Sequence, residues 1–353
     1  MIKSMHIENF KCFKDFDIEL GPFNVLIGPN DSGKTAFLQA ILLMTEVRPG
    51  QVGTPGNLQH TLGFTVGPDC VWHEDSSADV RMMVPAVRSN QSNWMQAVLR
   101  SQKDAEIWTS IVEADPTARE YREVGGRSDD SARLEWLDKN VGTSALYRFD
   151  PRALRQPCPL LPSPYRIGPN GEGLPAFVLA IAGDDPDKFK QMRSEFLTRF
   201  GYTVKARQIQ GKVALAFEAT FGEIPAESVS DGVILSLAFL ALSSFSKPPN
   251  TLMVEEPENG VHHSSLKKIV GTLKHLSKDK GVQVIVTTHS PYLLDEVEPE
   301  EVRVFAKDDE GAVHATNMAS VKDVDDMRKH FMTGEIWTSF SEARLVPKGG
   351  GKK

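Results

Sequence analysis

The segment from residue 28 to residue 35 constrains this chain more than any other part of its sequence. It reads Gly28-Pro29-Asn30-Asp31-Ser32-Gly33-Lys34-Thr35, which has the pattern G-x-x-x-x-G-K-T. An apolar run at 23–27 precedes it, and apolar residues with helical spacing follow it from Ala36 to Val47. A strand before the loop and a helix after it are the context of a phosphate-binding loop. We therefore predict a nucleotide-binding site in this segment.

The residue types of this loop suit phosphate chemistry. Its glycines let the backbone curl until N–H groups and the helix N-terminus converge on the phosphates. Lys34 adds a point charge, and the Thr35 hydroxyl is a suitable ligand for Mg²⁺. The residues predicted to bind the nucleotide here are Gly28, Asn30, Asp31, Ser32, Gly33, Lys34 and Thr35. The competing interpretation is a glycine-rich turn before a core helix.

The composition fits a protein with a large core and no membrane span. Of 353 residues, 40% are hydrophobic and 25% are charged, which allows one large domain with an insertion or two domains. The longest apolar stretch, 233–245, is too short to span a bilayer, and the N-terminus is unlike a signal peptide. The three cysteines are far apart and show neither zinc spacing nor a disulfide framework, so we expect a reducing cytoplasm. The net charge of −7 argues against a broad electrostatic grip on nucleic acid, and any DNA contact is expected to be a local patch.

Changes of pattern along the chain predict an insertion. Alternating apolar residues from Met1 to Leu20 indicate a two-stranded hairpin. A polar section from about 89 to 140 favours helices, and the many prolines of 150–175 argue against regular helix or central strand there. The predicted domains are a nucleotide-binding core at 1–60 and 226–320, an inserted, mostly helical lobe at 61–225, and a C-terminal helix and tail at 321–353.

Further chemical motifs begin at residue 230. Ser230-Asp231-Gly232 precedes a helix at 233–242 that is apolar nearly all round and therefore buried. A buried strand at 251–254 ends in Glu255-Glu256-Pro257-Glu258-Asn259-Gly260, where acids are costly unless they meet a cation or a donor. The Mg²⁺ of a nucleotide is the simplest such cation. An amphipathic helix then leads to the strand 282–288 and to His289, so the acids and the histidine are expected at strand carboxyl ends, where α/β sheets bind ligands.

The order of these motifs resembles the ABC-type ATPases of the SMC, RecF and OLD (overcoming lysogenisation defect) group. It is most similar to the compact ATPases of that group that lack a coiled coil and a fused nuclease. Residues 20–45 and 228–295 carry the specific part of the resemblance, and 147–151 and 334–337 are also similar. The implied fold is α/β: a P-loop NTPase, with an ABC-type head, a mixed sheet and an inserted, mostly helical lobe. Because the segment after His289 is short, we expect no fused nuclease domain.

The resemblance implies a role for each motif in binding and hydrolysing ATP. Lys34, Thr35 and the loop glycines are expected to bind ATP and Mg²⁺. Glu255 takes the metal-binding Walker B position, Glu256 the position of the base that deprotonates water, and His289 that of the switch histidine at the γ-phosphate.

The remaining motifs imply a second subunit. The segment 258–260 corresponds to the D-loop, which contacts that subunit. Ser230, Asp231 and Gly232 match the signature motif, which completes the ATP site of the opposite subunit. A hydroxyl and free N–H groups at a helix N-terminus are suitable donors for a γ-phosphate.

Some positions depart from the usual pattern. Asp231 replaces the commonest glycine of the signature, Val233 follows where a polar residue is frequent, and Glu255 replaces the usual aspartate. No local pattern identifies the glutamine of the Q-loop, although Gln59 lies at a plausible distance. Simpler interpretations also exist: helix caps for Ser230 and Asp231, a solvated pair for the two glutamates, and an ordinary loop histidine for His289.

The implied function is a cytoplasmic, Mg²⁺-dependent ATPase. Its ATP-bound homodimer, or a higher oligomer of dimers, is expected to act on DNA or on a partner such as a separate nuclease or toxin, in DNA repair or antiviral defence. One alternative is the ATPase subunit of a transporter, against which stand the S-D-G signature, the missing Q-loop pattern and the long insertion. The other is a nucleotide-gated scaffold with negligible turnover, against which the position of Glu256 argues.

Overall fold

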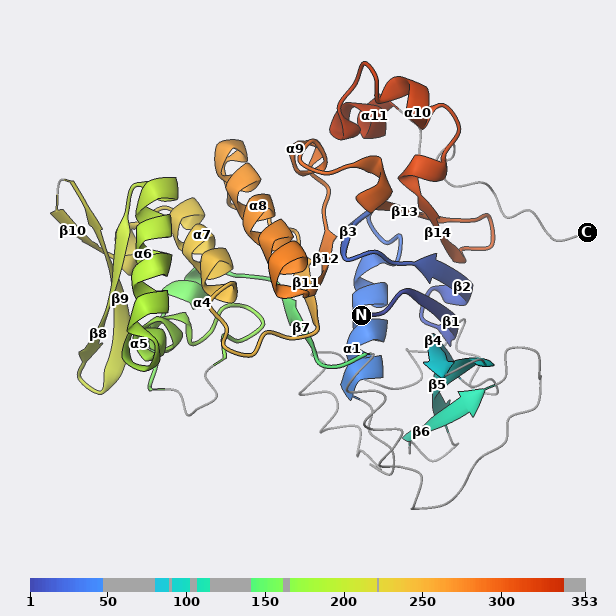
Figure 1. Ribbon diagram of the computed structural model, residues 1–353, viewed down its shortest axis with the longest axis horizontal. Coiled ribbons are helices and arrows are strands. Elements are labelled where there is room, and N and C mark those ends of the chain that lie inside the picture. Colours follow the sequence, from blue (N-terminus) through green and yellow to red (C-terminus); the bar gives the residue numbers. More distant parts are fainter. Residues whose placement is uncertain are drawn as a thin grey trace, which may run out of the picture. The chain divides into compact units, whose positions relative to one another are not determined.

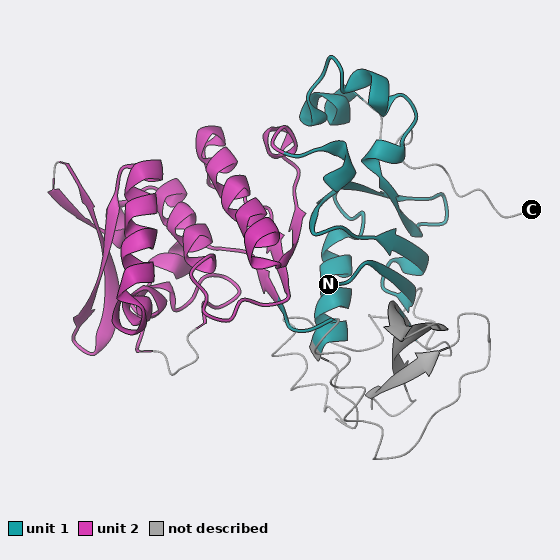
Figure 2. Cartoon of the chain, in the orientation of Figure 1, with its two compact units in different colours: residues 1–144, 297–353 teal, residues 145–296 magenta. Residues whose placement is uncertain are grey.

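The chain divides into two compact units, which are coloured separately in Figure 2. The computed structural model describes residues 1–46, 80–88, 91–101, 107–114, 141–160, 166–220 and 222–339. Unit 1 comprises residues 1–144 and 297–353, and unit 2 comprises residues 145–296. The predicted domains were drawn from sequence motifs, whereas the two units are defined by their spatial compactness. The predicted boundaries therefore remain a prediction.

The strands of unit 1 belong to two sheets (Figure 1). Its elements are β1 (Ser4–Phe10), β2 (Phe13–Glu19), β3 (Phe23–Ile27), α1 (Lys34–Glu46), β4 (Val80–Arg88), β5 (Gln91–Ser101), β6 (Ile107–Ala114), η4 (Pro299–Glu301), β13 (Val302–Lys307), β14 (Val313–Asn317), η5 (Met318–Ser320), α10 (Val324–Met327) and α11 (Thr333–Ser339). In one sheet, β13 pairs in parallel with β3 and antiparallel with β14. The other sheet has the order β2-β1-β4-β5-β6 and only antiparallel pairs.

A cluster of buried phenylalanines holds the elements around the predicted phosphate loop. The ring centroid of Phe16, on β2, lies 5.9 Å from that of Phe37, on α1, and 5.6 Å from that of Phe305, on β13. The rings of Phe37 and Phe305 are 5.8 Å apart. Tilted aromatic pairs at such separations stabilise a core beyond the area they bury. This cluster fixes the first turn of α1, and with it the loop, against β13.

Unit 2 is built around a parallel strand pair. The elements of this part of the chain are β7 (Ser144–Tyr147), α4 (Pro151–Arg155), α5 (Leu174–Asp184), α6 (Pro186–Phe200), β8 (Thr203–Ile209), β9 (Lys212–Ala219), β10 (Gly222–Pro225), η3 (Ala226–Ser228), α7 (Asp231–Leu242), β11 (Thr251–Glu255), α8 (His263–Lys280), β12 (Gln283–Thr287) and α9 (Pro291–Leu294). β11 and β12 are parallel and in register from Thr251–Gln283 to Glu255–Thr287, with α8 as their connection. β8, β9 and β10 form a separate antiparallel sheet.

The two long helices beside this pair follow their sequence patterns. α7 is buried at every residue from 234 to 242, as expected for a helix that is apolar nearly all round. α8 buries one face, which includes Leu266, Ile269 and Leu273. The predicted mixed α/β fold and the strand–helix–strand unit are therefore confirmed.

The expectation of a mostly helical insertion is wrong in the part that the structure describes. Residues 91–101 and 107–114, inside the section expected to be helical, form β5 and β6. The segment 107–112 contains β-branched and aromatic residues that favour strands, and β5 and β4 supply the pairing partners. These strands are neighbours in the chain, but β4 also pairs with the distant β1, so the sheet that they extend could not be recognised from the local pattern alone.

The proline-rich stretch also contains a helical turn that the sequence argued against. α4 begins at Pro151, and the side chain of Asp150 accepts a hydrogen bond from the Arg152 N–H at 2.8 Å. Proline is compatible with the first turn of a helix because its missing N–H has no intrahelical partner there. Among the described helices, none is long and apolar enough to cross a membrane.

Candidate functional site

In unit 1, the predicted phosphate loop connects β3 to α1. All five residues of β3 are buried, so the loop leaves the core at Gly28. Ser32 and Lys34 turn inward and are buried, whereas Asn30, Asp31 and Thr35 are exposed. The loop therefore presents polar side chains to solvent next to the N-terminus of a helix, the arrangement that binds anions.

Two glycines of the loop have no space for a side chain. Gly28 has a φ of 149°, and a Cβ there would lie 2.2 Å from the carbonyl oxygen of Phe305. Gly33 has a φ of 89°, and its Cβ would lie 2.8 Å from the Cys12 sulfur. Only glycine allows this close approach and this backbone conformation. The curled backbone thus fits the phosphate cradle that its sequence pattern predicts.

The Lys34 side chain lies inside its own loop. Its ammonium donates to the carbonyl oxygens of Gly28 at 2.9 Å and Pro29 at 2.7 Å, and its distance to the Ser32 hydroxyl is 3.3 Å. A buried charge needs such partners. Phosphate oxygens are stronger acceptors because they are charged, so the same ammonium can exchange these contacts for a nucleotide.

Asp31 connects the loop to the neighbouring strand. Its backbone is left-handed, with a φ of 64°, and its carboxylate forms an ion pair with the Lys307 ammonium of β13. Aspartate tolerates this conformation better than most residues do. The exposed Asp31 carboxylate therefore links the loop to β13 on its solvent-exposed side.

In unit 2, the predicted acids and the histidine lie at the ends of the parallel pair. Glu255 ends β11 opposite Thr287 of β12, and the Glu256 N–H donates to the carbonyl of Thr287 at 2.9 Å. The His289 Nε2 atom lies 3.9 Å from a carboxylate oxygen of Glu256. This distance is too long for a direct hydrogen bond. Glu256 and His289 thus point to one small region, as the crossover topology predicts.

Neighbouring side chains hold this pair in place. The Asn259 amide donates to the Glu256 carboxylate at 2.7 Å, and Glu256 itself is left-handed with a φ of 45°. Such backbone conformations cluster at functional sites. Glu258 accepts from the Thr288 hydroxyl at 2.7 Å and from the His289 N–H at 2.9 Å. The segment 258–260, predicted as a D-loop, therefore holds the Glu256 carboxylate and the backbone of His289, which the sequence analysis did not expect.

The signature segment opens α7. Ser230 occupies the N-cap position, but its side chain makes no capping hydrogen bond. The carboxylate of Asp231 instead accepts from the guanidinium of Arg155 at 2.6 Å. A Cβ on Gly260 would lie 3.5 Å from the Cβ of Asp231, so the D-loop and the signature segment are neighbours in unit 2. The simple capping interpretation therefore lacks the side-chain bond that defines a cap.

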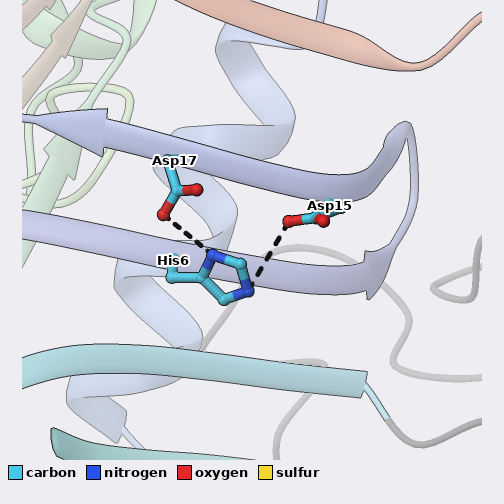
Figure 3. A group of neighbouring side chains, drawn as sticks. All are labelled: His6, Asp15 and Asp17. Atoms are coloured by element: carbon cyan, nitrogen blue, oxygen red, sulfur yellow. Dashed lines mark hydrogen bonds and ion pairs between the residues drawn. The ribbon is translucent and has the colours of Figure 1, made fainter. Parts of the chain in front are cut away.

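A further polar cluster lies on the β1–β2 hairpin (Figure 3). The His6 ring contacts Asp17 at 2.8 Å, Glu8 at 3.2 Å and Asp15 at 3.8 Å. Hydrogen bonds to Asp17 and then to Glu8 raise the pKa of His6 to about 10. This cluster was not found from the sequence, because its residues meet only through the strand register that places His6 opposite Asp17.

The structure thus gathers the predicted residues into two groups. Gly28 to Thr35 lie in unit 1, and the signature segment, Glu255, Glu256 and His289 lie in unit 2. Gln59 lies outside the described residues. Arg155 contacts a predicted site residue and was missed, since it belongs to no recognisable pattern at its own position. Asn259 was expected only as part of the D-loop segment, and its contact with Glu256 was not foreseen.

Two protein-family descriptions match the chain. Residues 1–75 match an AAA ATPase domain, and residues 180–295 match an AAA domain described as putative AbiEii toxin, Type IV TA system. The first match contains the phosphate loop, and the second contains the signature segment, both acids and His289. The two groups of site residues therefore each lie within an AAA-type match.

Two individual proteins are similar over all or most of the chain. The OLD nuclease of Thermus scotoductus (strain ATCC 700910 / SA-01) is 22% identical over 412 residues, covering 100% of this chain and 72% of that protein. The SMC head domain from Thermotoga maritima aligns with a TM-score of 0.49 and 12% identity, covering 90% of this chain and 98% of that one. The family matches and the OLD relative confirm the resemblance drawn from the motif order. The roles of individual residues remain predictions.

Proposed function

We propose that this chain, an SMC/RecF/OLD-like P-loop ATPase, hydrolyses Mg·ATP and that its ATP-bound homodimer switches a separate effector. The proposal is carried by two features of the same chain: a loop with the backbone of a phosphate cradle, and a buried strand that leads into two glutamates, the second of which lies beside a histidine. We place the protein in the cytoplasm, in agreement with its cysteine pattern.

The residues of unit 1 bind the nucleotide in this proposal. Backbone N–H groups of the loop and the first turn of α1 surround the phosphates, and the Lys34 ammonium moves from loop oxygens to phosphate oxygens. The Thr35 hydroxyl and the Glu255 carboxylate are the residues that would hold Mg²⁺, which supplies charge stabilisation to the phosphoryl group when bound. Glu255 is a longer ligand than the usual aspartate.

The residues of unit 2 prepare the attacking water. Glu256 accepts the proton, and the Asn259 amide keeps its carboxylate in one orientation. Glu258 fixes the backbone of His289, which contacts the γ-phosphate. The Glu256 carboxylate and the His289 backbone are thus positioned before the nucleotide arrives, which lowers the cost of organising the site during the reaction.

The dimer and the effector form the wider part of the proposal. Ser230, Asp231 and Gly232 complete the ATP site of a second copy, so association of two copies depends on ATP. The match to an AAA domain described as a putative toxin and the similarity to an OLD nuclease favour an effector that acts on nucleic acid or as a toxin. A dimer that closes on ATP and opens after hydrolysis gives such an effector a timed signal.

Phosphate release by a Glu256→Gln variant tests the central step. The amide cannot take a proton, so we expect ATP to bind normally while hydrolysis falls roughly 10²- to 10⁴-fold. Chelation of Mg²⁺ by EDTA should abolish the wild-type activity. Glu195→Gln, the same substitution on α6, is the matched control and should hydrolyse ATP like the wild type.

Two results would contradict the proposal. Wild-type turnover in Glu256→Gln would show that another group activates the water. Tight ATP binding without measurable turnover in the wild type would instead favour the scaffold alternative.

A further inference from the structure

The short helix α4 ends in an arginine that reaches the signature segment. The Arg155 guanidinium donates to the carbonyls of Ala226 at 3.0 Å and Val229 at 2.9 Å, and to the Asp231 carboxylate at 2.6 Å. It also donates to the Pro151 carbonyl at 3.2 Å, and its side chain is 14% exposed. A planar guanidinium with five donors can hold several acceptors at once, as no lysine can.

Arg155 is itself firmly held. The Asp150 side chain caps α4, and the backbone N–H groups of Arg148 and Asp150 donate to the carbonyls of Pro169 and Asn170. Leu154, the preceding residue, is fully buried. The guanidinium therefore extends from a rigid base, which makes it suitable for fixing a neighbouring segment.

The three contacts of Arg155 to residues 226–231 fall on both sides of Ser230 in the sequence. Val229 and Asp231, its two neighbours in sequence, are both hydrogen bonded to Arg155, whereas Ser230 is exposed and makes no capping bond. The chain on each side of the serine is thus held by Arg155, while the serine hydroxyl makes no capping hydrogen bond. The same contact places a positive charge against the one carboxylate in the S-D-G motif.

We propose that Arg155 is a positioning residue for the composite ATP site, holding Ser230 in place and neutralising Asp231 so that the segment can accept a γ-phosphate. This inference rests on the proposed function. It also gives a reason why an aspartate is tolerated at a signature position, since an unpaired carboxylate would repel phosphate. The loss of Arg155 is expected to weaken the trans contact while leaving nucleotide binding by unit 1 intact.

The first test compares Arg155→Lys with Arg152→Lys. Lysine keeps the charge but cannot reach several acceptors, so we expect ATP hydrolysis to fall roughly tenfold or more and the ATP affinity of each protomer to stay within about twofold. Arg152 is an exposed arginine on the same turn, and its lysine variant should match the wild type. Wild-type hydrolysis by Arg155→Lys would overturn the inference.

Mixing experiments separate a positioning role from a general loss of stability. Arg155→Lys mixed with Lys34→Ala pairs an intact phosphate loop with an intact signature segment, so we expect part of the activity to return. Arg155→Lys mixed with Ser230→Arg has two damaged signature segments and should stay inactive. Equal activity of the two mixtures would overturn the inference.

A reference mixture distinguishes failure of the Arg155 proposal from failure of the proposed shared ATP site. Lys34→Ala mixed with Ser230→Arg must regain activity if ATP sites are shared between two subunits. Failure of that mixture would overturn the composite site itself, and the Arg155 proposal with it. If the reference mixture regains activity but the mixture of Arg155→Lys with Lys34→Ala does not, the Arg155 proposal alone is overturned.

Discussion

At the scale of single residues, Lys34 combines two roles. The sequence predicted for this lysine only a charge that binds phosphate. In the structure it is 7% exposed and donates to two carbonyls of its own loop. Its charge therefore helps to close the loop before any nucleotide is bound. Removing it is expected to affect the loop as well as the ligand.

Lys34→Ala should lower ATP affinity by roughly a hundredfold or more, because charge-assisted bonds to phosphate are lost. The melting temperature should fall by about 1–4 °C, because loop carbonyls lose their buried donor. Titration with a fluorescent ATP analogue and a thermal melt measure the two effects. Lys322→Ala, at an exposed lysine of unit 1, is the control for both. Undiminished affinity in Lys34→Ala would refute the phosphate-loop assignment.

At the scale of elements, the β1–β2 hairpin shows how alternating apolar and polar residues give a pair of strands one buried face and one outward face. Met5 and Ile7 on β1, and Phe16 and Ile18 on β2, are buried, while the residues between them face outward. The outward face carries His6 among carboxylates. These contacts raise the pKa of His6 to about 10, so the ring is protonated at neutral pH.

The hairpin should therefore lose stability in alkaline solution. The His6 pKa is near 6.5 in the unfolded chain and about 10 in the folded one, so the protonated ring stabilises the fold fully below about pH 6.5. That contribution declines as pH rises and disappears above the folded pKa.

We expect His6→Gln to melt about 2 °C below the wild type at pH 6, the size expected of partly exposed ion pairs. At pH above about 10 the two proteins should melt together, since His6 is then neutral in both states. Thermal melts across this range measure the difference, with His330→Gln, at an exposed histidine, as control. A difference that is independent of pH would show that the ring acts by packing rather than by charge.

At the scale of the whole molecule, each unit holds a different part of the proposed machinery. Unit 1 carries the phosphate loop, and unit 2 carries the acids, the histidine and the signature segment. Within unit 2, the D-loop lies beside the N-terminus of α7. Both segments expected to meet a second subunit are therefore close together.

Ser230→Arg tests whether this segment completes the site of another copy. A long cation should block close approach, so we expect each protomer to bind ATP while hydrolysis and ATP-driven dimerisation fail. Light scattering with ATP in the Glu256→Gln background measures the mass with and without Ser230→Arg. Ser194→Arg adds the same side chain to an exposed serine on α6 and should leave dimerisation unchanged. Unchanged ATP-driven association of the Ser230→Arg variant would show that this segment only begins helix α7.

The sequence by itself determined the elements whose reasons are local. The phosphate loop, the apolar helix α7 and the crossover from β11 to β12 were all recognisable, because periodicity, glycine spacing and strand-end polar residues act within a few positions of one another. The order of those motifs was enough to indicate the ATPase group that the comparisons support.

Only the tertiary structure decided the features that depend on distant partners. The strands at 91–101 and 107–114 extend a sheet in which β4 pairs with the distant β1, and His6 meets Asp17 through strand register. Arg155 reaches Asp231, 76 positions along the chain, because α4 is anchored beside α7. A guanidinium or a strand edge finds its partner only after the chain has folded, so neither the partner nor its geometry is present in any local pattern.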